Sequence, residues 1–175
     1  VTNKEYTCYY AKVRDRDLPM AVDVLADMVS ASLIDPVEFE TERGVILEEL
    51  AAADDDPGDV ANERFAEAVF GVHPLGRPIG GSEASIEAVG RDAVMEHYHE
   101  HYLPSDLVIT AAGAVDHDLL VAAAVAALSA GGWAMDAIAP PRARRDTAAA
   151  AIAPTEPIRV VRRSLEQVNL IIGAP

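Results

Sequence analysis

Glu42 and Glu49 are the residues of this chain whose type and spacing point most directly to chemistry. They are seven positions apart, which is two helical turns, so on a helix they share one face. A carboxylate that turns into an apolar core is costly unless a cation or hydrogen bonds compensate its charge, and zinc accepts glutamate oxygen as a ligand. The same stripe also carries apolar residues at three- and four-residue spacing: Val45, Ile46, Ala52 and Ala53. Spacing alone leaves a second interpretation open, in which the face is half-buried and both carboxylates are solvated.

A second pattern lies further along the chain, where His97, Glu100 and His101 match H-x-x-E-H. In that motif two histidines one turn apart bind a metal, and the glutamate acts as general base. The motif also needs a third ligand, usually a glutamate from a helix well downstream, but only Glu156 and Glu166 follow, both outside predicted helices. We therefore interpret the match as a coincidence. The alternative, a small zinc protein that uses His97 and His101, stays open.

The remaining reactive residue types exclude several kinds of site. A single cysteine, Cys8, rules out an internal disulfide and a thiolate zinc cluster. Cys8 stands in an apolar, strand-like stretch, which predicts a buried and unreactive thiol. The glycines at 76, 80 and 81 do not follow a strand, so a phosphate-binding loop is excluded, and no serine or cysteine has the context of a nucleophile elbow.

Capping residues and apolar periodicity predict the helices that position these side chains. The glutamate pair falls on a helix with Asp35 as N-cap and Pro36 at its first position, running to about Ala53. The histidines fall on a helix over 91–102. Further helices are predicted over 20–29 after an Asp17 cap, over 60–70, after a Ser82 cap, and over 116–128. Runs of β-forming residues predict strands over 6–13, 107–112, 158–163 and 168–172.

Charge and hydropathy exclude other function classes. The chain has 29 acidic and 14 basic residues and a net charge of -15, which argues against binding to nucleic acid or to anionic membranes. No apolar run reaches eighteen residues, so we expect no membrane span. No signal peptide is visible at Val1, which favours a cytoplasmic location.

Several segments, in order, resemble the pitrilysin/insulinase (inverzincin) family of zinc metallopeptidases, and within it the bacterial and mitochondrial processing-peptidase branch. A string of ordered matches is more specific than any one of them. The segment with Glu40, Glu42 and Glu49 is similar to the family's E-x6-E helix. The other matching segments are 2–5, 9–12, 17–27, 75–81, 101–104, 113–116 and 166–175.

The resemblance implies a peptide-bond hydrolase with one Zn2+ in each complete catalytic site. It makes Glu49 the third zinc ligand and Glu42 the glutamate that supports the site. The two histidine ligands and the general base, which activates the zinc-bound water, would lie before Val1. No catalytic residue is then expected in this chain, and the isolated chain is expected to be inactive. Because the family places its H-x-x-E-H motif before the E-x6-E helix, the resemblance also makes the match at His97 a coincidence.

The resemblance also implies a fold and partners. We expect an α+β fold, a mainly antiparallel sheet with helices packed on one face. Residues 1–128 would form most of the catalytic half, 129–157 an Ala/Pro-rich connector, and 158–175 strands leading into a following domain. The implied partners are a peptide or unfolded-protein substrate and a second homologous half or subunit. The alternative function is a non-catalytic binding or scaffold member of the same family.

Overall fold

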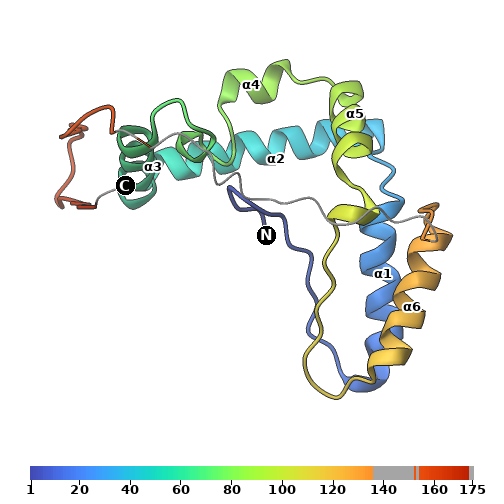
Figure 1. Ribbon diagram of the computed structural model, residues 1–175. Helices are drawn as coiled ribbons and strands as arrows, with labels where there is room; N and C mark the ends of the chain where they lie inside the picture. Colours follow the sequence, from blue (N-terminus) through green and yellow to red (C-terminus); the bar gives the residue numbers. More distant parts are fainter. Residues whose placement is uncertain (136–151, 153, 174–175) are drawn as a thin grey trace. The chain divides into compact units, whose positions relative to one another are not determined.

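The computed structural model describes residues 1–135, 152 and 154–173, and within them the regular structure is helical (Figure 1). Three 3-10 turns, at Asp15–Asp17, Pro74–Gly76 and Pro104–Asp106, link the longer elements. None of the described helices is both long enough and apolar enough to cross a membrane. The α-helices are α1 Leu18–Ser30, α2 Pro36–Asp55, α3 Pro57–Phe70, α4 Glu83–Ala88, α5 Arg91–His101 and α6 His117–Ala130.

The chain divides into two compact units. The first combines Val1, Cys8–Asp35 and the described part of Gly90–Asp146, so it holds α1, α5 and α6. The second combines Thr2–Thr7, Pro36–Val89 and the described part of Thr147–Pro175, so it holds α2, α3 and α4. The predicted boundaries at 128 and 157 stay a prediction, and most of the predicted connector, 136–151 and 153, lies outside the described residues.

The first unit is built on the packing of α1 against α6, which lie side by side in Figure 1. Its buried side chains are mostly small, so the two backbones can approach closely, and Leu128 of α6 is only 2% exposed. Next to it, a Cβ atom on Gly131 would lie 1.9 Å from the Ser30 hydroxyl oxygen. The residues buried here are Ala26, Val29, Ser30, Tyr98, Ala124 and Leu128.

In the second unit α2 contacts both α3 and α4. Pro57 separates α2 from α3, because its ring disfavours helical backbone at the residue before it. Asp56 then caps α3: its carboxylate accepts hydrogen bonds from the backbone N–H groups of Gly58 (2.7 Å) and Asp59 (3.1 Å). Val60 and Val69 of α3 are the buried apolar residues of this unit. Local sequence chemistry therefore sets where α3 begins.

The predicted α+β fold is wrong, since the described residues contain no strand and no sheet. The segments 6–13, 107–112, 158–163 and 168–172 are not assigned to any strand, and an isolated bridge joins Thr2 to Thr7. Most of their apolar side chains face solvent, with Val108 76% and Leu170 79% exposed, while Leu107 and Ile171 are half-buried. β-Forming residues favour extended backbone, but a strand also needs a long enough neighbouring backbone to pair with. Here the first segment pairs only through that single bridge and the hydrogen bonds beside it, and the other three are not paired as strands among the described residues. Over the residues that the structure describes, the fold is all-helical.

The predicted helix starts were closer to the structure. Pro36 begins α2 as predicted, Ser82 caps α4, and Asp116 caps α6 by accepting a hydrogen bond from Leu119 N at 3.0 Å. Asp17 occupies the N-cap position of α1 but makes no capping bond, because its carboxylate binds Arg14 Nε at 2.7 Å instead.

Candidate functional site

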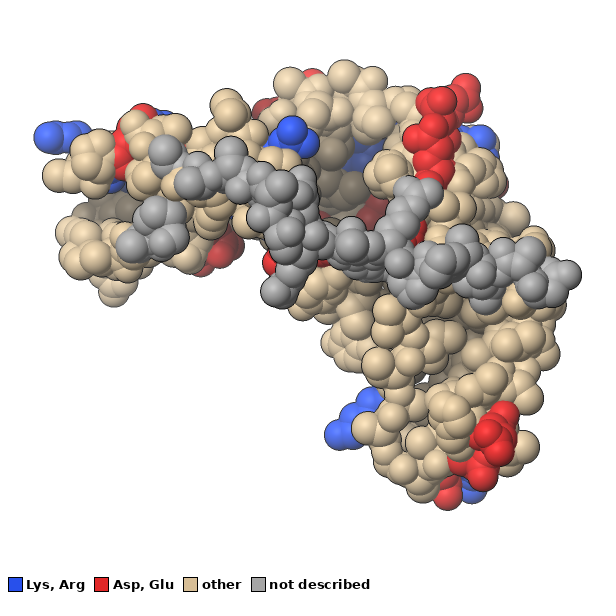
Figure 2. All heavy atoms as spheres, viewed as in Figure 1, with Lys and Arg blue, Asp and Glu red and all other residues tan. Residues whose placement is uncertain are grey.

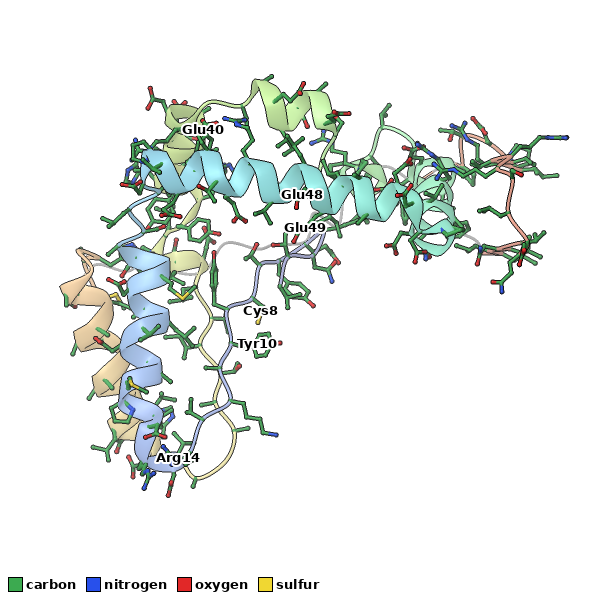
Figure 3. The ribbon with its side chains drawn as sticks, turned by 180° about the vertical axis from the view of Figure 1, so that it is seen from behind. Cys8, Tyr10, Arg14, Glu40, Glu48 and Glu49 are labelled. Carbon is green, nitrogen blue, oxygen red and sulfur yellow. The ribbon has the colours of Figure 1, made fainter. Side chains whose placement is uncertain are left out.

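The two faces of α2 differ in exposure, and this difference places its glutamates. One stripe is half-buried and the other is exposed. Glu42 and Glu49 both belong to the exposed stripe, together with Val45 and Ala52. Figure 3 shows Glu49 beside Glu48 on the later half of the helix, away from Glu40 near its start. The half-buried stripe consists of Phe39, Arg43, Ile46, Leu47, Leu50 and Ala53.

Both site glutamates are solvated in this structure. Neither Glu42 nor Glu49 has a hydrogen-bond or ion-pair partner in the part of the chain that is described. Of the two interpretations of their spacing, the structure supports the solvated face. An exposed carboxylate without a partner costs little, and it leaves Glu49 free to meet a cation or a partner chain. The roles of Glu49 as zinc ligand and Glu42 as its support stay predictions.

The described residues do not assemble a complete metal site. No group of three or more His, Cys, Asp or Glu side chains that could hold a metal occurs among them. The carboxylate of Glu49 suits zinc chemically, but a protein zinc site takes three or four protein ligands.

Arg43 holds the half-buried face of α2 against α4, and nothing in the sequence pattern singled it out. Its guanidinium donates hydrogen bonds to the backbone oxygens of Ile86, Glu87 (3.4 Å) and Val89 (2.8 Å). These carbonyls lie at the C-terminal end of α4, where helix carbonyls lack intrahelical partners. The guanidinium also stacks over the Phe39 ring at 4.9 Å. Arg43 thus orients the helix that presents Glu49.

Glu40 completes this arrangement on the surface. Arg43 Nε donates to a Glu40 carboxylate oxygen at 3.0 Å. That hydrogen bond lowers the pKa of Glu40 and raises the pKa of Arg43, so both groups keep their charges. The negative charge of Glu40 is thus compensated by the positive charge of Arg43, whereas Glu42 and Glu49 on the same helix have no such partner among the described residues.

The second sequence motif lies on α5, in the other compact unit from Glu49. His97, Glu100 and His101 are all exposed. The imidazole rings of His97 and His101 lie one turn apart on the helix, with their centres 4.3 Å apart and their planes tilted by 50°. The inward side of α5 is formed by Tyr98, which is buried. The spacing correctly placed the two histidines on one face of a helix.

Cys8 is exposed, so the prediction of a buried thiol is wrong. It lies on the extended N-terminal segment, as Figure 3 shows. The prediction assumed a paired strand in a sheet, and without that sheet nothing covers the side chain. Its neighbour Tyr9 is better anchored, because its hydroxyl and that of Tyr102 form a hydrogen bond of 3.0 Å. Partial burial, and then this hydrogen bond, raise the pKa of Tyr9 to about 12.

Charged side chains are spread over the surface shown in Figure 2, where the basic residues occupy separate positions and form no continuous patch. The acidic residues visible in this view gather in a few groups, the most extended at its upper right and lower right.

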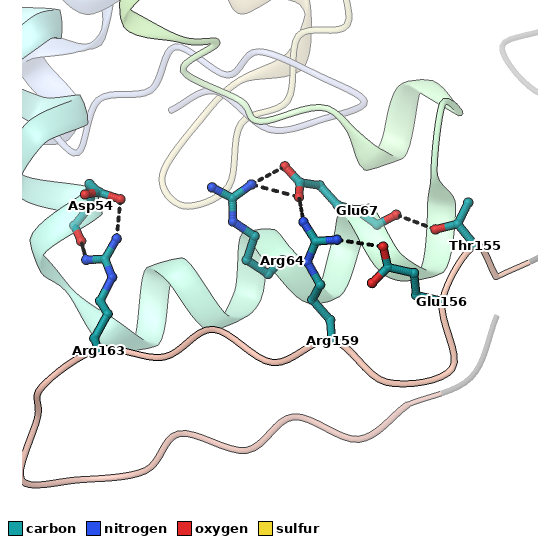
Figure 4. A network of polar contacts seen from close by, with 7 residues as sticks. All are labelled: Asp54, Arg64, Glu67, Thr155, Glu156, Arg159 and Arg163. Atoms are coloured by element: carbon teal, nitrogen blue, oxygen red, sulfur yellow. Dashed lines mark hydrogen bonds and ion pairs between the residues drawn. The ribbon is translucent and has the colours of Figure 1, made fainter.

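A network of ion pairs lies along α3 (Figure 4). Arg64 Nη1 donates to both carboxylate oxygens of Glu67, at 2.7 and 2.8 Å. Arg159 pairs with the same carboxylate at 3.9 Å and with Glu156 at 2.6 Å. Glu67 therefore joins the helix to a segment almost a hundred residues further along the chain.

Two further contacts attach this later segment. The Thr155 hydroxyl donates to the backbone oxygen of Glu67 at 3.3 Å, near the end of α3. Arg163 Nη2 contacts the Asp54 carboxylate at 2.6 Å, and Nη1 donates to the Asp54 backbone oxygen. No local sequence pattern singles out Arg163, because residue type and spacing do not indicate an acidic partner that lies more than a hundred positions away.

Comparison with known proteins shows which family this chain resembles. A family profile described as Insulinase (Peptidase family M16) matches residues 1–83, which include Glu42 and Glu49. A protein of Streptomyces coelicolor that is named an uncharacterized zinc protease is 44% identical over 99% of this chain and 38% of its own length. Proteins with the same description from Mycobacterium tuberculosis and Bacillus subtilis are 47% and 39% identical, over 69% and 68% of this chain and 28% and 29% of their own lengths. The chain thus spans less than two-fifths of the length of these relatives.

Proposed function

This chain belongs to the insulinase family of peptidases, and from that premise we propose that it forms part of a zinc-dependent metalloendopeptidase. The observation that carries the proposal is an unpaired, exposed carboxylate, Glu49, within the segment that matches the family profile. The names of the relatives, which are zinc proteases, support the same activity.

In this proposal Glu49 supplies one oxygen ligand to the zinc ion. Glu42, two turns earlier on the exposed stripe, orients the groups around that ligand. A zinc ion bound there would lower the pKa of a coordinated water molecule, so that at neutral pH the water could give a proton to the general base and act as the nucleophile toward a peptide carbonyl. The two histidine ligands and the general base come from residues outside these 175. The contribution of this chain is a carboxylate on a rigid helix.

Arg43 supports this function indirectly, because it helps to fix the orientation of α2. It ties the opposite face of α2 to the end of α4, so the direction in which Glu49 points is set by packing and not by a flexible loop. The proposed substrate is a peptide or an unfolded protein, and the proposed structural partner is a second homologous half or subunit.

A pair of matched variants in the full-length protein tests the proposal. Glu49→Gln keeps the size and exposure of the side chain but removes the anionic ligand, and we expect it to lose bound zinc and peptidase activity. Glu48→Gln is the control, because Glu48 is the neighbouring exposed glutamate on the same helix but outside the stripe. Zinc content by elemental analysis and cleavage of a quenched unfolded-protein substrate are the measurements.

The same measurements also distinguish the proposed peptidase from the alternative, non-catalytic function. A wild-type protein that holds no zinc and cleaves no unfolded substrate would support a non-catalytic binding or scaffold member of the family. Equal zinc loss in the Glu48→Gln and Glu49→Gln variants would contradict the specific role of Glu49. The gene sequence on both sides of this chain gives an independent check: an encoded H-x-x-E-H segment before Val1 supports the peptidase.

A further inference from the structure

His97 and His101 form an exposed imidazole pair near the end of α5, and the proposed peptidase mechanism does not use it. Both side chains are solvent-exposed, and their ring centres are 4.3 Å apart. Residues four apart on a helix lie one above the other, so both rings project from one face. Tyr98 and its hydrogen bond to Val29 lie on the buried side of the same helix, which fixes the outward direction of the pair.

This separation fits joint ligation of one ion. Two imidazole nitrogens that bind one ion at about 2.0–2.1 Å place their ring centres roughly 5 Å apart. The observed rings are within about an ångström of that distance, and exposed side chains can rotate to close the difference. Imidazole is a preferred ligand of Cu2+, Ni2+ and Zn2+ and a poor one for Mg2+ or Ca2+.

The electrostatic surroundings also favour a cation at this position. The carbonyl groups at the C-terminal end of a helix carry partial negative charge, and His101 is the last residue of α5. Glu96 and Glu100, both exposed and without an ion-pair partner among the described residues, precede the two histidines. A divalent ion at the pair would therefore meet a negative local potential and not a positive one.

We propose that His97 and His101 bind a divalent transition-metal ion as a two-histidine site. The described structure collects no third His, Cys, Asp or Glu ligand, so water completes the coordination sphere. Such a site is open and exchangeable, unlike a closed structural zinc site with four protein ligands. The inference depends only on α5 and does not rest on the proposed peptidase activity.

A calorimetric titration with Ni2+ tests the proposal on the full-length protein, with any resident metal left in place. We expect the His97→Ala variant and the His101→Ala variant each to weaken Ni2+ binding about a hundredfold, because each loses the chelate effect of the second ligand. His99→Ala is the matched control. His99 is an exposed histidine on the same helix, but it lies on another face, where its ring contacts Tyr98 at 5.3 Å. Its replacement should leave Ni2+ binding unchanged.

A rescue variant distinguishes chelation from any change in folding. Ala93 is exposed and lies one turn before His97. In a His101→Ala background, Ala93→His creates a new pair at the same spacing, and we expect it to restore Ni2+ affinity to within a few-fold of the original. The proposal is overturned if His97→Ala binds Ni2+ as well as the wild type, if His99→Ala loses binding equally, or if the Ala93→His rescue restores nothing.

Discussion

The phenolic hydroxyl of Tyr98 donates a hydrogen bond to the backbone oxygen of Val29, 2.8 Å away. The same hydroxyl accepts a hydrogen bond from Ser32 N at 3.2 Å. Val29 lies in the last turn of α1, where carbonyl groups have no intrahelical partner. The Tyr98 side chain of α5 thus caps the C-terminal end of α1 and forms hydrogen bonds with two backbone groups, the Val29 carbonyl and the Ser32 N–H.

The variant Tyr98→Phe should therefore lower the free energy of unfolding by about 1–3 kcal/mol, because the ring still packs but a buried carbonyl loses its donor. Urea unfolding followed by circular dichroism measures the change. Tyr10→Phe is the control, since Tyr10 is exposed and its replacement should stay within about 0.5 kcal/mol. Equal stabilities of the two variants would contradict the role of Tyr98.

The variant Gly131→Ala should also destabilise the first unit. A Cβ atom at this position would lie 1.9 Å from Ser30 Oγ and 2.8 Å from Ser30 Cβ, so α1 and the end of α6 must separate. We expect a loss of about 1–3 kcal/mol in thermal unfolding.

Two further variants make the test for Gly131 specific. Adding Ser30→Ala should restore only part of the loss, because the contact with Cβ persists. Gly44→Ala, in the interior of α2 with open space around it, should instead stabilise the protein by roughly 0.5–1 kcal/mol.

The variant Arg43→Lys should loosen the contact between α2 and α4. A lysine ammonium cannot reproduce the fork that binds three backbone oxygens or the stacking over Phe39. We expect a lower free energy of unfolding and faster hydrogen exchange in α4. Arg16→Lys is the control, because the Arg16 side chain is 68% exposed and meets Asp17 only at 3.8 Å. Unchanged exchange in α4 of the Arg43 variant would exclude this clamp.

The stability of the first unit should fall as the pH rises from 10 to about 12. Tyr9 has a pKa of about 12 in the folded chain against 10 when unfolded, so in this range the unfolded state releases a proton that the folded state keeps. The stabilisation is complete below pH 10 and is lost as the pH approaches 12.

Urea unfolding as a function of pH checks this expectation, and tyrosinate absorbance identifies the group that titrates. Tyr9→Phe should remove most of the slope in this range. A slope that persists unchanged in Tyr9→Phe would assign it to another group.

The variant Glu42→Gln should have a smaller effect on zinc than Glu49→Gln. In the proposed site Glu42 supports a ligand without being one, and losing such a group weakens metal binding about 10- to 100-fold. A zinc competition titration on the full-length protein measures this. If Glu42→Gln and Glu49→Gln behave identically, the distinction between ligand and support fails. If Glu42→Gln binds zinc like the wild type, Glu42 has no part in the site.

Local chemistry in the sequence determined where helices begin and which residues share a face. Pro36, Ser82 and Asp116 mark helix starts because capping bonds and the fixed proline φ act within a few residues. The spacing of Glu42 and Glu49, and that of His97 and His101, likewise determined that each pair lies on one face. No knowledge of distant contacts was needed for these predictions.

Tertiary packing alone decided which face meets solvent and which extended segments pair. Glu49 is exposed because the opposite stripe of α2, with Arg43, packs toward α4. Cys8 is exposed because its segment, although β-forming in composition, lies outside any sheet in the described structure. Helix caps are made by residues that are neighbours in the chain. Strand pairing and burial depend instead on backbone and side chains that come together from distant parts of the chain. The residue type at one position does not specify which distant segment will pair with it or cover it.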